Sequence, residues 1–277
     1  MTSALASPRR QGALNLRGYA GLASMESKKF LVYHWSVVVD LIKNLIATVV
    51  FVYFWRALYA NTARIAGLTL DATLAYILLA RIFQPLGGFI LVSEFGSLLR
   101  RGGIAHIQLR PLDIQLAYYV QNWATVVVDL GRQVPVALVA LLVFHFQWPT
   151  DPVVWGVFVL SALLGRSVLF CFDYILGCVA FYTTSAWGLG FAVFGLSLFL
   201  GGGLVPLAML PDWLRLIVLN TPFAQAFYVP ISLLSGVTPL SEAPRLLLVQ
   251  FVWLLGLAPL SRLVFAIAIR RVTVQGG

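Results

Sequence analysis

Six stretches of this chain are long and apolar enough to cross a lipid bilayer, and this limits the fold more than any other feature. A helix needs about 20 apolar residues to cross the hydrocarbon core. Only 10% of the residues are charged, whereas soluble domains have about 25%. The sequence therefore predicts an all-α integral membrane protein with six transmembrane helices. They cover residues 35–58, 70–92, 116–146, 153–182, 185–205 and 246–269. The third is expected to kink at Pro135, because proline disrupts a helix interior.

The distribution of lysine and arginine predicts which side each loop faces. Cytoplasmic loops of membrane proteins carry an excess of both residues. If the amino terminus is inside, only Arg64, Arg215 and Arg245 fall in external loops. The cytoplasmic segments then hold Arg9, Arg10, Arg17, Lys28, Lys29, Arg100, Arg101, Arg110, Arg270 and Arg271. We expect a multi-pass protein of the cytoplasmic (inner) membrane with both termini in the cytoplasm. The same bias accounts for the net charge of +9, so no nucleic-acid partner is predicted.

A single membrane domain is expected over residues 24–271, between cytoplasmic tails at 1–23 and 272–277. It begins with SMESKKFLVYH at 24–34, which mixes basic and apolar side chains. This composition is typical of an amphipathic helix that lies on the cytoplasmic interface of the bilayer. The pattern fits equally well a frayed lead-in to the first span.

Prolines interrupt the apolar segment between the fifth and sixth predicted spans. Pro206, Pro211, Pro222 and Pro230 make a continuous helix there unfavourable. Because proline is favoured at a first helical position, we expect two short helices, at 211–219 and 222–234, that dip into one face of the membrane. Such breaks occur at membrane depth only where protein covers them or where they line a water-filled cavity. The segment 206–236 is therefore predicted to be an external re-entrant element beside a pathway.

Charged residues recur inside the predicted spans, where they are costly and usually face a protein interior. The charges are Asp40, Lys43, Arg81, Asp129, Arg132, Arg166 and Asp173. Opposite charges three residues apart share a helix face. One interpretation is that Asp40 with Lys43, Asp129 with Arg132, and Arg166 with Asp173 neutralise each other and lock helices together. The other is that they form a polar patch along a substrate or ion pathway. A proton relay is disfavoured, because each acid has a basic neighbour.

The cytoplasmic loop between the second and third spans, 93–115, reads SEFGSLLRRGGIAHIQLRPLDIQ. It is either a basic loop without a partner or a docking element for a cytoplasmic protein, with Glu94 and the arginines as polar contacts.

A family resemblance rests on this loop and on the later segments of the chain. The matching residues are Leu109-Arg110-Pro111-Leu112-Asp113, Phe181-Tyr182-Thr183, Gly201 to Pro206, Pro211-Asp212-Trp213-Leu214, Pro222-Phe223, and Tyr228 with Pro230. In order and spacing the chain resembles the ABC type-2 exporter permeases, and within them the branch that works with a separate ATPase subunit. The resemblance covers roughly residues 25–271.

The resemblance implies an architecture, partners and site residues. It implies two facing permease subunits, of the same or different chains, above an ATPase dimer that binds ATP and Mg. A coupling helix would lie within 93–113, with a smaller contact at 182–186. The ATPase-coupling residues would be Glu94, Arg100, Arg101, Arg110, Asp113, Tyr182 and Thr183. The external gate would comprise Pro206, Pro211, Trp213, Pro222, Phe223 and Tyr228.

The residues themselves argue against ATP hydrolysis on this chain. Its three lysines, Lys28, Lys29 and Lys43, are not followed by Ser or Thr, so the phosphate-loop motif is absent. The histidines, His34, His106 and His145, are scattered, so no metal, cofactor or catalytic site is predicted. We therefore expect the transport subunit of an ATP-driven exporter. The alternatives are an ATP-independent secondary transporter or channel, and a lipid-modifying membrane enzyme, for which no clustered nucleophile, base or metal site is found.

Overall fold

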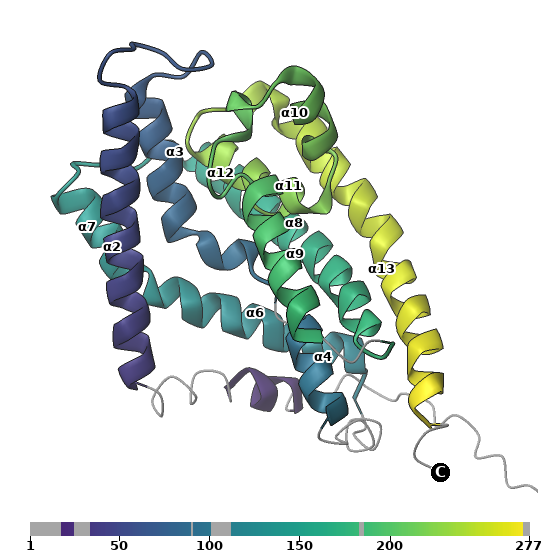
Figure 1. Ribbon diagram of the computed structural model, residues 1–277. Coiled ribbons are helices and arrows are strands. Elements are labelled where there is room, and N and C mark those ends of the chain that lie inside the picture. Colours follow the sequence, from purple (N-terminus) through teal and green to yellow (C-terminus); the bar gives the residue numbers. More distant parts are fainter. Residues whose placement is uncertain (1–17, 25–33, 90, 101–111, 183–185, 274–277) are drawn as a thin grey trace, which may run out of the picture.

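The computed structural model describes residues 18–24, 34–89, 91–100, 112–182 and 186–273. These residues are helical apart from the connecting turns and one isolated bridge between Ile65 and Leu68. Long helices run between the two ends of the molecule (Figure 1). The elements are α2 (His34–Leu58), α3 (Leu70–Ile82), η1 (Gln84–Gly87), α4 (Leu91–Arg100), α6 (Ile114–Arg132), α7 (Val134–Leu142), α8 (Pro152–Val179), α9 (Ala186–Leu200), η2 (Leu207–Met209), α10 (Asp212–Leu219), α11 (Pro222–Ala226), α12 (Tyr228–Leu234), η3 (Leu240–Glu242) and α13 (Ala243–Thr273).

Four helical segments are long and apolar enough to cross a membrane, and they match the first, third, fourth and sixth predicted spans. They are Val38–Leu58, Ile114–Leu142, Pro152–Val179 and Leu240–Arg270. A shorter apolar helix, Gly188–Leu200, lies within the fifth predicted span. The prediction of an all-α membrane protein is confirmed by these elements. The predicted amphipathic segment at 24–34 falls almost entirely outside the described residues, while residues 18–24 form a short helix just before it.

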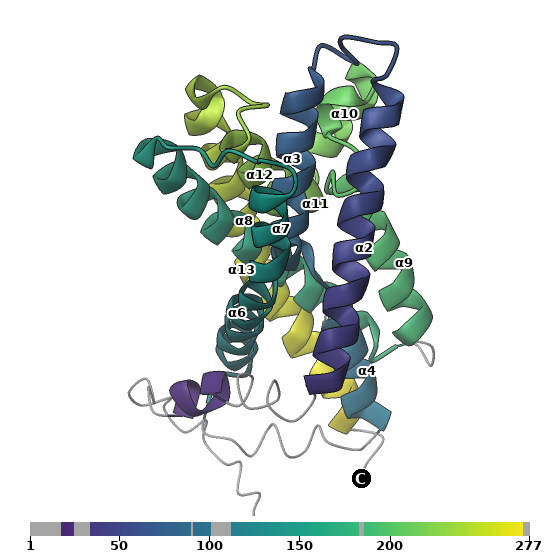
Figure 2. The same cartoon turned by 90° about the vertical axis from the view of Figure 1, so that its left-hand side faces the viewer.

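The second predicted span, 70–92, is not one continuous helix. The α3 helix ends at Ile82, η1 follows, and α4 begins at Leu91. The expectation of an unbroken helix is wrong for a local reason. Pro85 at the start of η1 lacks an amide N–H, and Gly88 takes an extended conformation (φ −74°, ψ 143°). Together α3, η1 and α4 still lead from one end of the molecule to the other (Figures 1 and 2).

The third predicted span bends where the sequence placed the kink. Gln133 is both the C-cap of α6 and the N-cap of α7, and Pro135 occupies the first turn of α7. Proline is accepted in a first turn because the amide N–H there has no partner within the helix. The break turns α7 away from the strongly tilted α6 (Figure 1).

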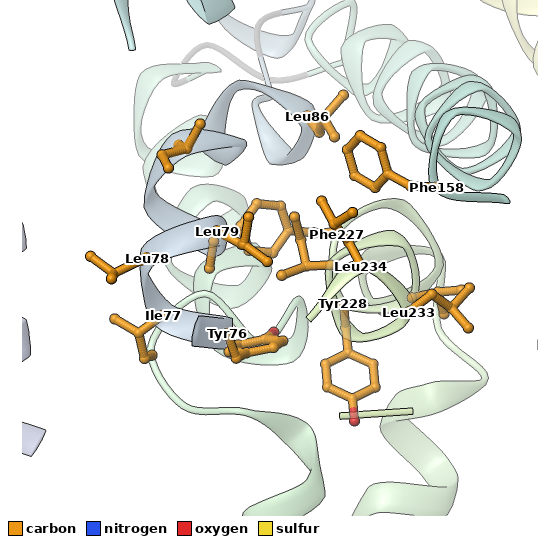
Figure 3. Packing of buried hydrophobic residues seen from close by; sticks show 14 of the residues in the cluster. Tyr76, Ile77, Leu78, Leu79, Leu86, Phe158, Phe227, Tyr228, Leu233 and Leu234 are labelled. Atoms are coloured by element: carbon orange, nitrogen blue, oxygen red, sulfur yellow. The ribbon is translucent and has the colours of Figure 1, made fainter. Parts of the chain in front are cut away.

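The α8 helix is the central element, with half of its span buried inside the protein. Asp151 caps its amino terminus by accepting from the Val153 N–H, and Pro152 is its first residue. It packs against α13, α4, α11 and α12. Near its start Phe158 enters a buried cluster with Tyr76 and Leu79 of α3 and Leu234 of α12 (Figure 3). The Tyr76 hydroxyl ties this cluster to the end of α9 by donating to Gly202 O at 2.8 Å.

The proline-rich segment forms three short helices at the end of the molecule that holds the α2–α3 turn (Figure 1). The expected helix at 211–219 is α10. The expected helix at 222–234 is divided at Phe227 into α11 and α12, whose residues are all buried. Close packing against α8 explains the burial of α11. Gly165 of α8 lies so near that a Cβ atom there would be 2.3 Å from Gln225 O.

Candidate functional site

A cavity of about 490 Å³ lies between α2, η1, the α6–α7 break and α9. This is within the usual range for small-molecule sites. It is lined by Asp40, Leu41, Lys43, Asn44, Ala47, Gln84, Pro85, Gly87, Gly88, Asp129, Arg132, Gln133, Phe194, Ser197, Leu198, Gly203 and Phe227. Five different segments of the chain therefore meet at one site, because Phe227 is added from the division between α11 and α12.

Two ion pairs line this cavity. Lys43 Nζ lies 2.5 Å from Asp40 Oδ1 on α2, and Arg132 Nη1 lies 2.8 Å from Asp129 Oδ1 on α6. Exposed fractions of 67% and 60% for the first pair, and 33% and 32% for the second, leave both open to whatever fills the cavity. Both pairs have the predicted spacing of three residues. Their convergence on one cavity depends on how α2 and α6 pack and could not be read from spacing.

Neutral polar side chains also line the cavity. Asn44 Nδ2 donates to Gln133 Oε1 at 3.4 Å and so connects α2 with the α6–α7 break. Ser197 of α9 donates to Gly87 O at 3.3 Å. We did not single out these residues from the sequence, although an amide directly after Lys43 and another after Arg132 inside apolar spans would have been a usable signal.

Other lining residues are apolar. They include Phe194 and Leu198 of α9 and Phe227 at the division between α11 and α12. The sequence offered no signal for Phe227, which is one aromatic among many. The cavity thus presents both charged or amide groups and aromatic or aliphatic groups, and it can hold a molecule with both characters.

Arg166 of α8 holds the broken segment that forms part of the cavity wall. Its Nη1 donates to Leu86 O at 3.0 Å and Gly88 O at 2.7 Å. Its Nε donates to Asn122 Oδ1 at 2.9 Å. The carbonyl groups at the end of a helix have no partners within it, and leaving such buried groups unbonded costs about 1–3 kcal/mol each. Arg166 therefore stabilises the break rather than serving only as a counter-ion.

Asp173 binds the other side of the same break. Its Oδ2 accepts from the Leu91 N–H at 3.1 Å, at the start of α4. Seven residues along α8 correspond to a rise of about 10.5 Å, so Arg166 and Asp173 contact successive parts of the interrupted segment. Each side chain holds a backbone group of this segment, and the expectation that the two residues also neutralise each other stays a prediction.

Among the charges within the predicted spans, Arg81 lies at neither the cavity nor the helix break. It does not line the cavity, and its Cζ lies 4.1 Å from the centroid of the Phe51 ring on α2. Such contacts between a cation and an aromatic face are favourable, especially away from water. The seven charges of the predicted patch thus divide into four at the cavity, two at the helix break and Arg81 between α3 and α2.

Of the residues predicted to couple to an ATPase, those that the structure describes lie on or beside α4, α6 and α8. Glu94 is in the first turn of α4, and Tyr182 is exposed just beyond α8. Asp113 caps α6, with its Oδ1 accepting from the Leu116 N–H at 2.7 Å. The structure describes Arg100 only as the last residue of α4, and Arg101, Arg110 and Thr183 lie outside the described residues. Their role in coupling stays a prediction.

The residues predicted to form an external gate fall into two groups. Pro206, Pro222, Phe223 and Tyr228 are buried, whereas Pro211 is exposed and Trp213 has 66% of its surface exposed on α10. Phe223 packs against Phe89 and Phe172, with ring centroids 5.8 Å and 5.3 Å apart. The buried members are packing residues in this conformation, and their role as a gate stays a prediction.

Long apolar helices around a charged cavity define a multi-pass helical membrane protein with a polar site inside its bundle. The family model described as "ABC-2 family transporter protein" matches residues 45–276. The chain therefore belongs to the ABC-2 transporter family, and the resemblance noted in the sequence is confirmed. Members of this family are membrane subunits rather than ATPases, and they generally work with ABC ATPases. No curated protein matches the chain in a comparison of sequences.

Proposed function

We propose that this chain is the permease subunit of an ATP-driven ABC exporter and that the cavity between α2, η1, α6–α7 and α9 is part of its translocation pathway. The observation that carries the proposal is the meeting of two ion pairs at this cavity. Charged groups within membrane spans are expensive and typically mark a pathway or a protein interior. Simple locking of neighbouring helices would not require four charges from two helices to border an open space.

The proposed topology has six crossings. They are α2, the interrupted α3–η1–α4, the kinked α6–α7, α8, α9 and α13. The excess of basic residues in loops supports cytoplasmic termini and an inner-membrane location. In this orientation the segment holding α10, α11 and α12 is the external re-entrant gate. Burial of α11 and α12 by α8 supports it, since irregular backbone at membrane depth must be covered by protein.

A second permease subunit, of the same or a different chain, would complete the pathway. The cavity is bordered by α2 and α9, which both expose large apolar side chains, including Ile42 and Ile46 on α2 and Phe191 on α9. A partner packed on these faces would separate the cavity from lipid. The four charges at the cavity sum to zero, so the cargo that fits this wall is an amphipathic molecule with a polar or zwitterionic part.

The driving force would enter from the cytoplasmic side through residues 93–113, which include most of α4. An ATPase dimer with its own ATP and Mg would contact Glu94, the loop arginines, and the turn at Tyr182. Movement of α4 would reach η1, whose residues line the cavity. Transport requires that nucleotide favours one of two conformations by binding it more tightly. ATP hydrolysis takes place on the partner, since the chain has no phosphate loop.

An accessibility experiment tests this proposal without knowledge of the cargo. Cys171 and Cys178 are first replaced by alanine, and Ala47→Cys is introduced on the cavity side of α2. In vesicles holding the permease and the ATPase encoded beside it, a membrane-impermeant maleimide should label this cysteine from one side only. Trapping the ATPase with nucleotide should move the labelling to the other side. Val50→Cys, on the exposed face of α2 outside the cavity lining, is the control and should show no such switch.

Two results would contradict the proposal. One is failure of the tagged chain to copurify with any ATPase. The other is gradient-driven flux through the purified chain alone, which would establish the alternative of an ATP-independent transporter or channel.

A further inference from the structure

A second cleft, of about 410 Å³, lies between α6, α8 and α13. It is lined by Gln115, Leu116, Tyr119, Ser167, Phe170, Cys171, Leu254, Ala258, Pro259 and Arg262. It shares no lining residue with the central cavity. The cleft lies near the start of α6, toward the end of the molecule where α4 and α13 finish (Figure 1). Because α6 and α13 belong to candidate membrane spans, we expect lipid around this cleft.

Gln115, which lines this cleft, has an unused hydrogen-bond acceptor. The Ser261 hydroxyl donates to Ala258 O at 2.9 Å, so it must accept the bond from Gln115 Nε2 at 2.8 Å. This fixes the orientation of the Gln115 amide. Its Oε1 is buried and has no hydrogen-bond partner among the residues that the structure describes. A buried acceptor in this state is satisfied only if a ligand or water supplies a donor, and the Gln115 side chain must shift slightly to admit one.

The guanidinium group of Arg262, which lines the same cleft, has few polar partners. Arg262 Nη2 is 3.8 Å from Asp113 Oδ2, which is too long for a hydrogen bond. The Asp113 carboxylate is also engaged in capping α6. The Arg262 side chain remains 68% exposed, and a guanidinium group has five donors to satisfy. Within the described part of the chain, this group therefore has an ionic neighbour but no acceptor at hydrogen-bond distance.

The rest of the cleft is apolar. Leu116, Phe170 and Leu254 line it together with Pro259, which lies inside α13. A proline in a helix interior removes one backbone hydrogen bond and displaces the preceding turn. Polar groups at one place and an apolar wall beside them match the two parts of a phospholipid, a charged headgroup and an acyl chain.

We propose that this cleft is a specific site for an aminophospholipid, with the lipid phosphate on Arg262 and the headgroup ammonium donating to Gln115 Oε1. Arginine suits phosphate because its planar group offers several donors at once. A headgroup with N–H donors satisfies the buried acceptor, whereas a trimethylated choline headgroup cannot. With the topology proposed above, the lipid belongs to the cytoplasmic leaflet, where basic pockets between helices are known to bind lipid headgroups. The binding itself requires neither that topology nor a transport activity.

Native mass spectrometry of the full chain in detergent tests the site, with phosphatidylethanolamine and phosphatidylcholine as probes. The wild type should retain phosphatidylethanolamine in preference to phosphatidylcholine. The Arg262→Gln variant should bind phosphatidylethanolamine about tenfold more weakly, as expected from the loss of a charged hydrogen bond. Gln115→Leu should lose the preference between the two lipids while still binding both. Arg245→Gln, an exposed arginine at the other end of α13, should behave as wild type.

The Arg262→Lys variant distinguishes loss of the binding site from misfolding, because it keeps the positive charge and should retain part of the lipid affinity. Equal binding of the two lipids by the wild type would overturn the proposal, as would unchanged binding by Arg262→Gln. Either result would indicate that bulk lipid simply solvates this surface of the protein. The measurement uses neither the ATPase nor transport, so its outcome is independent of whether the chain is an exporter subunit.

Discussion

Gly165 determines how closely α8 and α11 can approach. A Cβ atom at this position would lie 2.3 Å from Gln225 O and 2.9 Å from Ala226 Cα, and both contacts are with backbone. We expect Gly165→Ala to force α11 away from α8 and to lower the free energy of unfolding by about 1–3 kcal/mol, the usual cost of overpacking. Thermal unfolding of the purified chain in detergent, followed by intrinsic fluorescence, measures the change.

Gly156 is the matched control on the same helix. A Cβ atom there would have no neighbour within 4 Å, so Gly156→Ala should leave stability unchanged or raise it by up to about 1 kcal/mol, because alanine favours helix. Equal destabilisation by the two substitutions would mean that the close contact between α8 and α11 does not matter for stability.

At the scale of single elements, the short helices between α9 and α13 differ in how strongly they are held. All residues of α11 and α12 are buried, whereas α10 exposes Trp213, Leu216 and Ile217. Amide hydrogens exchange most slowly where helices are buried and packed. We expect hydrogen–deuterium exchange of the chain in lipid nanodiscs to be slow over 222–234 and clearly faster over 212–219.

Peptides from the buried half of α8 provide the protected reference for this measurement. Exchange over 222–234 as fast as over 212–219 would show that α11 and α12 are not held against α8 in solution. Such a result would also remove the main support for a covered re-entrant segment.

The sequence predicted some of these elements well because their signals are local. Pro135 marks the kink between α6 and α7, Pro211 precedes α10, and Pro222 is the first residue of α11. The interruption between α3 and α4 was missed because its apolar residues resemble a continuous span. Its stability depends on Arg166, which is about 80 residues away in the chain.

The candidate site was less predictable than the fold. The sequence indicated that Asp40 pairs with Lys43 and Asp129 with Arg132, since three residues bring opposite charges to one helix face. It could not indicate that both pairs border the same cavity, because that depends on packing between α2, α6 and α9. Phe227 has no distinguishing local pattern and is placed in the cavity wall only by the division between α11 and α12.

In the whole molecule, α4 connects the proposed ATPase contact with the central cavity. Most of α4, from residue 93 onward, belongs to the loop predicted to couple, and the start of the helix follows η1, which lines the cavity. The helix is held closely by α8, since a Cβ atom at Gly177 would lie 3.0 Å from the Phe95 ring and 3.3 Å from Leu91 O. Asp173 adds a direct bond to the Leu91 N–H. A displacement of α4 would therefore be transmitted to η1 and α8 together.

The Asp173→Leu substitution tests this connection in the reconstituted permease–ATPase complex. It removes the acceptor for the Leu91 N–H, so movement of α4 should be transmitted less completely to the cavity wall. We expect the ATPase to remain bound and active, while the cavity cysteine introduced at Ala47 switches sides several-fold less often per ATP hydrolysed. The ratio of switching to hydrolysis is the informative quantity, because a merely destabilised protein would lose both activities in proportion. Asp71→Asn, an exposed acid at the start of α3, should leave the ratio unchanged, and an unchanged ratio in Asp173→Leu would place the transmission of force outside α4.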